Sequence, residues 1–212
     1  MKLLAKILLC TSFTLALTGC DPFEGLLSVK KAFTVISIEK NAGCNGETGY
    51  DCEQKVNVSV PAGDQNAKLD FVGKNQLQIS LKINGKKKTL NIDIPKNNIP
   101  SENGEFIISA ADLGQAFSAK GGIATNRTDS QMFHGFESCT YTRYETVCTV
   151  VNNQTVCHEI PRQVQGQQYV EYFNRTTQQN INVNFLNTEL LATFNGQRNF
   201  TDRIYTFKDR CY

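Results

Sequence analysis

The chain has 212 residues and carries 22 lysine and arginine side chains against 20 aspartate and glutamate side chains. This near balance excludes attraction to nucleic acid or to an anionic membrane surface through overall charge, which needs a basic excess. The length fits one large all-β domain or two small ones.

The first 20 residues have the layout of an export signal. Two lysines precede an apolar stretch from Ile7 to Leu17, and Thr18-Gly19 then leads to Cys20. The stretch is too short for a membrane-spanning helix, which needs about 20 apolar residues. The segment resembles a bacterial lipoprotein signal peptide with its lipobox. The resemblance implies that a signal peptidase removes residues 1–19 and that fatty acyl chains such as palmitate are attached to Cys20.

The lipid anchor sets the expected location of the protein. Residues 1–19 contain two lysines and no acidic residue, so the mature chain has equal numbers of basic and acidic side chains. Several acyl chains on one residue anchor firmly, since each buried methylene contributes about 0.8 kcal/mol. Asp21 resembles the inner-membrane retention signal of enterobacterial lipoproteins, which implies the periplasmic face of that membrane; the outer membrane is the alternative. Residues 20–30 are expected to be a lipidated tether, followed by an all-β domain over 31–212.

The first half of this domain reads as strands and a loop. Residues 32–38 are rich in β-forming side chains, and residues 56–60 alternate between valine and polar residues before Pro61. The segment between these strands is crowded with Gly and Asn, which indicates a loop. Cys44 and Cys52 bracket most of that loop.

The strongest local signal is a hairpin over residues 77–94. Apolar residues alternate with polar ones on both sides of Asn84-Gly85, the dipeptide most typical of a two-residue hairpin turn. The turn pairs Leu81 with Lys88, Ile79 with Leu90 and Leu77 with Ile92. The apolar side chains then share one face, so turn chemistry and hydrophobic period predict the same register.

The rest of the chain predicts one short helix and further strands. Ser109 is placed to cap a brief helix that Gly114 limits. Residues 118–131 have little apolar content, which suggests a boundary between possible subdomains at 31–118 and 132–212. A turn at 174–177 is expected to precede alternating strands over 180–185 and 190–196. Frequent turns and no long helical period favour an antiparallel β-sandwich or barrel.

Six cysteines follow Cys20, and an even number in an exported chain indicates disulfides. Strand-forming residues flank Asn152-Asn153, and Asn tolerates the positive φ of a two-residue hairpin turn. That turn places Cys148 opposite Cys157 at a non-hydrogen-bonded pair, where Cα atoms lie about 4.5 Å apart. The predicted disulfides are therefore Cys148–Cys157, Cys44–Cys52 around the Gly-rich loop, and Cys139–Cys211 at the C-terminus.

No sequence pattern predicts a catalytic residue, a metal ligand or a cofactor. His158-Glu159-Ile160-Pro161-Arg162 begins like a zinc-protease helix, but the second histidine is missing and a proline interrupts the helix. A zinc site of Cys139, Cys148, Cys157 and His158 has the wrong spacing, so disulfides are favoured. His134 falls in a loop-like stretch, where a lone histidine is usually solvated.

The favoured function is therefore a non-enzymatic binding or envelope-structural module held at the membrane through Cys20. Its partner is expected to be an envelope protein or a polysaccharide, and not nucleic acid. The aromatic side chains and the glutamines of the second half favour packing and a soluble face over a binding surface. These residues are Tyr141, Tyr144, Tyr169, Tyr172, Phe173, Gln163, Gln165, Gln167, Gln168, Gln178 and Gln179. The alternatives are a hydrolase inhibitor presenting the loop 44–52 and a carbohydrate-active enzyme with two concealed carboxylates.

Overall fold

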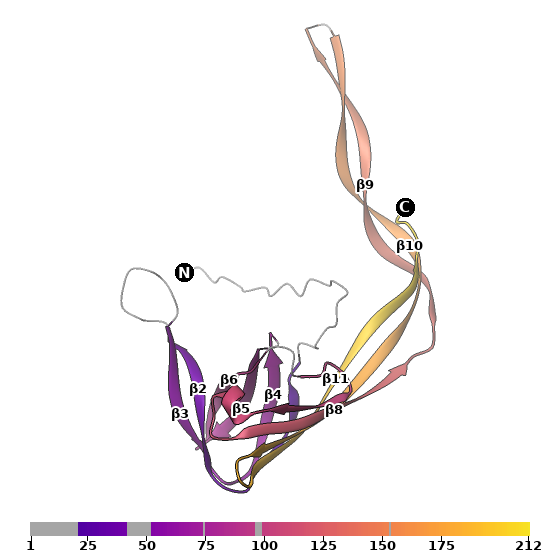
Figure 1. Cartoon of the computed structure of the whole chain (residues 1–212). Helices are drawn as coiled ribbons and strands as arrows, with labels where there is room; N and C mark the ends of the chain where they lie inside the picture. Colours follow the sequence, from indigo (N-terminus) through magenta and orange to yellow (C-terminus); the bar gives the residue numbers. More distant parts are fainter. Residues whose placement is uncertain (1–20, 42–51, 74, 96–98, 153) are drawn as a thin grey trace. The chain divides into compact units, whose positions relative to one another are not determined.

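The computed structural model describes residues 21–41, 52–73, 75–95, 99–152 and 154–212, and most of these residues are in β-strands (Figure 1). The chain divides into two compact units. Unit 1 comprises the residues up to Thr125 together with Gln178–Arg198, and unit 2 comprises Asn126–Thr177 and Asn199–Tyr212. The predicted all-β antiparallel class is confirmed.

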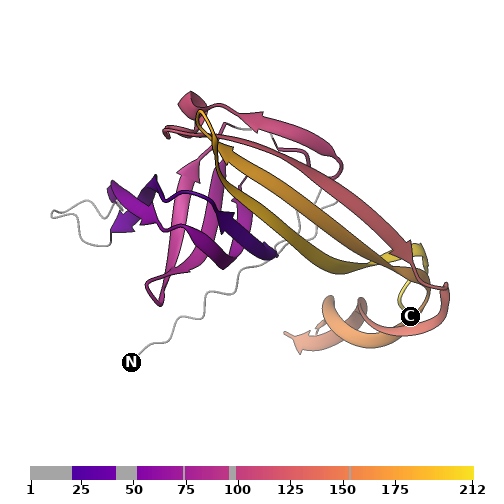
Figure 2. The same cartoon turned by 90° about the horizontal axis from the view of Figure 1, so that it is seen from below.

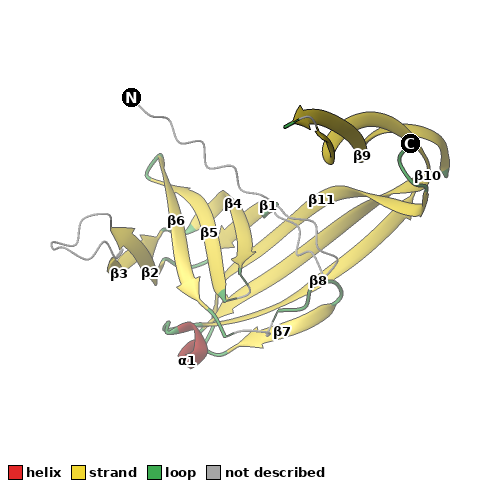
Figure 3. Ribbon diagram, turned by 90° about the horizontal axis from the view of Figure 1, so that it is seen from above, coloured by secondary structure: helices red, strands yellow, loops and turns green. Residues whose placement is uncertain are grey.

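Unit 1 is built on a curled antiparallel sheet (Figure 2 and Figure 3). Its strands lie in the order β6-β5-β4-β1-β11-β10-β8-β7. Their bounds are β1 Phe23–Val29, β4 Gly63–Val72, β5 Gln76–Ile83, β6 Lys86–Asp93, β7 Gly104–Ile108, β8 Ser118–Asp129, β10 Gln154–Leu186 and β11 Leu190–Lys208. The last three strands continue into unit 2. A second sheet pairs β2 Phe33–Asn41 with β3 Cys52–Val60.

The core of unit 1 forms where the inward side chains of both sheets meet. Val35 and Val60, from the small sheet, are fully buried in the same cluster as Phe117 and Phe185. Phe33 packs edge-on against Phe117, with ring centroids 5.3 Å apart. Buried aromatic side chains and the more numerous Leu, Ile and Val side chains of this cluster together supply the hydrophobic stabilisation.

Two predicted local structures of unit 1 are confirmed. Asn84 and Gly85 adopt φ angles of 51° and 76°, and the hairpin has the predicted register, with Ile79 opposite Leu90. The short helix α1 Ala110–Leu113 begins after Ser109, whose hydroxyl accepts a hydrogen bond from the Asp112 backbone N–H at 3.1 Å. Both features depend on neighbouring residues alone, so the sequence predicts them well.

The expected tether at residues 20–30 is wrong for most of its length. Phe23–Val29 forms β1, which lies between β4 and β11 and buries Phe23 and Leu27. The alternating pattern was obscured at Gly25, where no side chain fits. A Cβ atom there would lie 1.9 Å from the carbonyl oxygen of Asn195, so the close approach of β11 requires glycine.

The division into subdomains 31–118 and 132–212 also differs from the structure. The expected boundary at 118–131 is occupied mostly by the strand β8, and residues 178–198 return to unit 1. The turn expected at 174–177 is absent because β10 runs through it. Thr177 and Gln179 are polar but buried, and Gln179 donates to the carbonyl of Ser101 and the hydroxyl of Thr125, both at 3.0 Å. The polar residues made this segment resemble a turn in the sequence, although their hydrogen bonds allow them to be buried within a strand.

Candidate binding arm

Unit 2 contains a long twisted ribbon of two strands, β9 Phe133–Val151 and the first part of β10 (Figure 1). Its turn follows Val151, and Asn152 adopts a φ of 50°, as a two-residue hairpin turn requires. The strands keep one register from Val151 opposite Gln154 to Phe133 opposite Tyr172. We call residues 139–151 and 154–166 the arm, because within the described chain these segments of β9 and β10 pair in a sheet with each other and with no further strand.

Two disulfides staple this ribbon, with the predicted pairings. The tip disulfide joins Cys148 to Cys157, whose Cα atoms are 3.9 Å apart, the short spacing of a non-hydrogen-bonded pair. The base disulfide joins Cys139 to Cys211, and its Cα atoms are 5.8 Å apart. These four cysteines are therefore not thiolate ligands of zinc. The predicted Cys44–Cys52 disulfide and the inhibitory loop 44–52 lie outside the side chains that the structure describes.

One face of the arm exposes most of its apolar side chains, and Arg143, Glu145 and Arg162 interrupt it toward the base. Alternation along the paired strands puts six apolar side chains on this apolar face. They are Tyr141, Val147, Val151, Val156, Ile160 and Val164. Val147 is 37% exposed, Ile160 44% and Val151 54%. The opposite, polar face carries Thr and Gln side chains and Glu159, together with Tyr144, Val150, Pro161 and the tip disulfide. Toward its tip, the arm thus exposes apolar side chains that no core of its own covers.

The outer half of the arm also lacks charge. No Asp, Glu, Lys or Arg other than Glu159 occurs from Thr146 to Ile160, while Val150 at the tip is 72% exposed. Closer to the base, Arg162 lies 2.9 Å from Glu145 across the two strands, whereas Arg143 forms no ion pair with any described residue. A β-branched tip with so little charge is unfavourable in water, so it indicates a surface that is covered in use.

Aromatic pairs hold the base of unit 2 together. Phe136 packs against Tyr169 and Phe133 against Tyr172, with ring centroids 5.6 and 4.7 Å apart. Arg203 stacks on the ring of Tyr172, with 4.1 Å between its guanidinium carbon and the ring centroid. The packing role predicted for Tyr169 and Tyr172 therefore holds, while Tyr144 projects 64% exposed from the arm.

The glutamines of the second half do not form one soluble face. Gln163, Gln165 and Gln167 are exposed, but Gln168 and Gln179 are buried. The predicted polar surface therefore covers only part of this set. Phe173, which the sequence assigned to packing, lies under the guanidinium group of Arg175, 5.2 Å from the ring centroid.

Both histidines lie in strands of unit 2. His134 is in β9, not in a loop, and its Nδ1 lies 3.3 Å from Glu171, which also accepts a hydrogen bond from the Tyr169 hydroxyl. Burial, reinforced by that hydrogen bond, raises the pKa of Tyr169. His158 is exposed on the arm with Glu159 on the opposite face, as a strand requires. The described residues contain no group of three His, Cys, Asp or Glu side chains placed to hold a metal ion.

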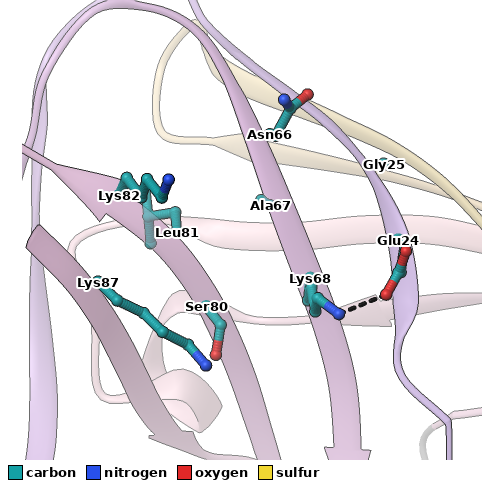
Figure 4. A pocket seen from close by; sticks show the side chains of 9 residues that line it. All are labelled: Glu24, Gly25, Asn66, Ala67, Lys68, Ser80, Leu81, Lys82 and Lys87. Atoms are coloured by element: carbon teal, nitrogen blue, oxygen red, sulfur yellow. Dashed lines mark hydrogen bonds and ion pairs between the residues drawn. The ribbon is translucent and has the colours of Figure 1, made fainter. Parts of the chain in front are cut away.

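Unit 1 has a separate hollow of about 670 Å³ on the outer face of its sheet (Figure 4). Lys82 and Lys87 lie directly opposite each other on β5 and β6 at its rim. Lys68 at the same hollow pairs with Glu24, but Lys82 and Lys87 have no carboxylate partner within the described part of the chain. Directly opposed like charges destabilise a sheet, so an anion bound between Lys82 and Lys87 would offset their electrostatic repulsion.

Sequence reasoning missed the arm as a surface, although it predicted the hairpin at the tip. The available signal was the uncharged run from Thr146 to His158 combined with the register of the turn. Comparison with known proteins finds no matching family model, no matching curated protein and no matching solved structure. No helix in the described part of the chain is long and apolar enough to cross a membrane.

Proposed function

We propose that the protein is a lipid-anchored binding module of the bacterial cell envelope and that the arm is its binding surface. The observation that carries this proposal is the apolar face of the arm, on which Val147, Ile160 and Val151 remain between 37% and 54% exposed. Single exposed apolar residues are ordinary, but Val147, Val151, Val156 and Ile160 are grouped on one face toward the tip of a two-stranded ribbon, which favours an interaction site. A ribbon of two strands is also marginal alone and gains stability from a partner.

The lipobox and the fold together support a domain held close to the membrane. Cys20 carries the anchor in this proposal, and β1 begins at Phe23. Only Asp21 and Pro22 separate them, so the first strand starts within about 10 Å of the acylated residue. Cys20→Ala expressed in a bacterial host should lose its lipid mass and its firm membrane association. Unchanged fractionation of this variant would refute the anchor.

Binding through the arm is tested by a matched pair of variants. Ile160→Asp places a charge on the apolar face, while Gln163→Asp places the same charge on the polar face of the same strand. Both positions are exposed, so neither variant should unfold the arm. Tagged full-length protein is crosslinked in envelope membranes, and bound proteins and glycans are identified by mass spectrometry. Ile160→Asp should lose the captured partner and Gln163→Asp should retain it; equal capture by both would contradict the proposal.

The hollow of unit 1 supports a second candidate function, which is binding of an anionic polysaccharide. Lys82, Lys87, Ser80 and Asn66 all line this hollow (Figure 4), and neither lysine ammonium group pairs with a carboxylate of a described residue. These groups are donors suited to phosphate, sulfate or carboxylate groups on a glycan. Titration with a phosphorylated oligosaccharide should give saturable heat that the Lys82→Gln/Lys87→Gln variant abolishes. Heat that is the same in this variant, or absent from the unmodified protein, would exclude the site.

A further inference from the structure

We propose that the arm pairs with the arm of a second copy of this chain, edge to edge, through antiparallel β9 strands centred on Tyr144. This inference rests on the proposed function, because it names a partner of the same arm, which binds along the β9 edge of the apolar face. Within the described residues β9 pairs only with β10, so its outer edge carries unpaired N–H and C=O groups. Such an edge is a template for a further strand.

The hydrogen-bond pattern of the ribbon identifies which groups face outward. Val151 and Gln154 close the two-residue turn as a hydrogen-bonded pair, and the two pair types alternate from there. Cys148 with Cys157 is then a non-hydrogen-bonded pair, in agreement with their Cα separation of 3.9 Å. Tyr144 with Pro161 has the same parity, so the backbone N–H and C=O of Tyr144 point away from β10.

Pro161 makes the two edges of the arm unequal. Proline has no N–H, so the outward edge of β10 lacks a donor at this position, which blunts strand addition there. The edge of β9 from Thr140 to Val150 contains no proline, no glycine and no lysine. The open edge that accepts a strand is therefore that of β9.

Charge complementarity selects a second copy and fixes the register. Arg143 and Glu145 lie on either side of Tyr144, on the same face of the strand. In an antiparallel pair centred on Tyr144, Arg143 of each copy faces Glu145 of the other. Arg143 has no ion pair with a described residue of its own chain, whereas Glu145 already contacts Arg162 and accepts a second cation. Centring the pair on Arg143 or Glu145 would oppose like charges, which is unfavourable.

The remaining side chains fit the same register. Tyr141 faces Val147 of the second copy on the apolar face, and Thr142 faces Thr146 on the polar face, with Tyr144 opposite its own counterpart. Aromatic–aromatic, aromatic–β-branched and Thr–Thr pairs are the favourable cross-strand combinations. The outward N–H and C=O groups of Thr142, Tyr144 and Thr146 all gain partners, and two marginal ribbons become one four-stranded sheet.

Engineered cysteines test the register in membranes of cells that express the full-length, lipidated chain. Tyr144 faces itself as a hydrogen-bonded pair, for which Cα atoms are about 5.5 Å apart, a spacing that suits a disulfide. Mild oxidation should therefore crosslink Tyr144→Cys into a homodimer. Thr142→Cys and Thr146→Cys should each remain monomeric alone and form a mixed dimer when coexpressed. Peptide mapping verifies that the native disulfides are retained.

Charge exchange supplies the second readout. Arg143→Glu should weaken dimerisation about tenfold, since both symmetric pairs become like-charged. Adding Glu145→Arg should restore it, because the pairs are rebuilt in reverse and the carboxylate introduced at position 143 lies opposite Arg162. A self-crosslink at Thr146→Cys in place of Tyr144→Cys would overturn the register. No self-crosslink at any position, together with partner capture that Ile160→Asp abolishes, would overturn self-pairing and leave the proposed binding function standing. If Arg143→Glu leaves crosslinking unchanged and Ile160→Asp leaves capture unchanged, both self-pairing and the proposed binding function are overturned.

Discussion

Replacing Phe23 with alanine is expected to destabilise unit 1 by about 4 kcal/mol, within the usual range for a buried Phe-to-Ala change. Phe23 is completely buried at the start of β1, where it lies opposite Leu69 of β4. The perturbation removes the ring and leaves a cavity in a core that cannot collapse readily, because β1 is hydrogen-bonded on both sides.

The guanidinium group of Arg198 adds to the cost. It lies 4.2 Å from the Phe23 ring centroid, is itself buried, and donates from Nε to the amide oxygen of Gln179 at 2.8 Å. Burial lowers the pKa of Arg198, so the charged form depends on favourable neighbours. Phe23→Leu keeps most of the apolar volume but loses the cation–π contact, and is expected to cost about 1–2 kcal/mol.

Urea denaturation followed by far-UV circular dichroism measures the effect, with the mature chain carrying Cys20→Ala as the reference. Leu26→Ala is the matched control, since Leu26 lies on the same strand but is 41% exposed; it should cost less than about 1 kcal/mol. The slope of the transition should stay constant across the series. A Phe23→Ala effect no larger than that of Leu26→Ala would refute the integration of β1 into the core and return residues 20–30 to the role of a tether.

Three further predictions concern backbone approach, crosslinking and charge. Gly121→Ala should destabilise unit 1 by about 2 kcal/mol, because its Cβ would lie 2.4 Å from the Asn182 carbonyl oxygen, whereas Gly122→Ala, with its nearest neighbour at 3.4 Å, should fall within about 0.5 kcal/mol in the same urea assay. Cys211→Ser should lower the melting temperature of unit 2 more than loss of the tip disulfide does, since a sequence separation of 72 against 9 corresponds to roughly 4 against 2.5–3 kcal/mol in the chain-entropy model; equal calorimetric shifts would contradict this. The hydrogen bond from Arg175 lowers the pKa of Asp129 in the folded protein. The pair therefore stabilises unit 2 fully at pH values above the ordinary pKa of 3.8, and this contribution is lost as the pH falls through the pKa of the folded protein. Arg175→Ala should raise the pKa of Asp129 in an NMR titration.

The elements that sequence reasoning predicted correctly are those decided within a few residues. Asn84-Gly85 sets both the turn and the register of its hairpin, and Asn152 does the same at the tip of the arm. In each case the residues that require positive φ and the alternation of the flanking strands lead to the same pairing. The tip disulfide follows from that register without any knowledge of the rest of the fold.

The elements that were missed depend on contacts between distant segments. Gly25 lies within a strand because Asn195 approaches it closely, and Gln179 is buried because Ser101 and Thr125 accept its amide protons. Neither partner is visible from the local pattern, so one segment looked like a tether and the other like the end of a turn. Prediction from local residue composition thus failed at Gly25 and Gln179, because contacts with distant segments stabilise residues that are unusual in a strand.

The candidate binding edge could have been derived from the same count that predicts the tip disulfide. A two-residue turn makes every second pair from Val151 outward non-hydrogen-bonded, which brings Cys148 to Cys157 and directs the backbone of Tyr144 away from β10. A loop extended by one residue into β10 would break the pairing of Cys148 with Cys157 and would place Pro161 where the ladder needs its missing N–H. The disulfide and the proline therefore indicate the same alternation of hydrogen-bonded pairs independently of each other. This alternation leaves Arg143, Tyr144 and Glu145 on an edge whose charges are complementary to those of the same edge in a second copy.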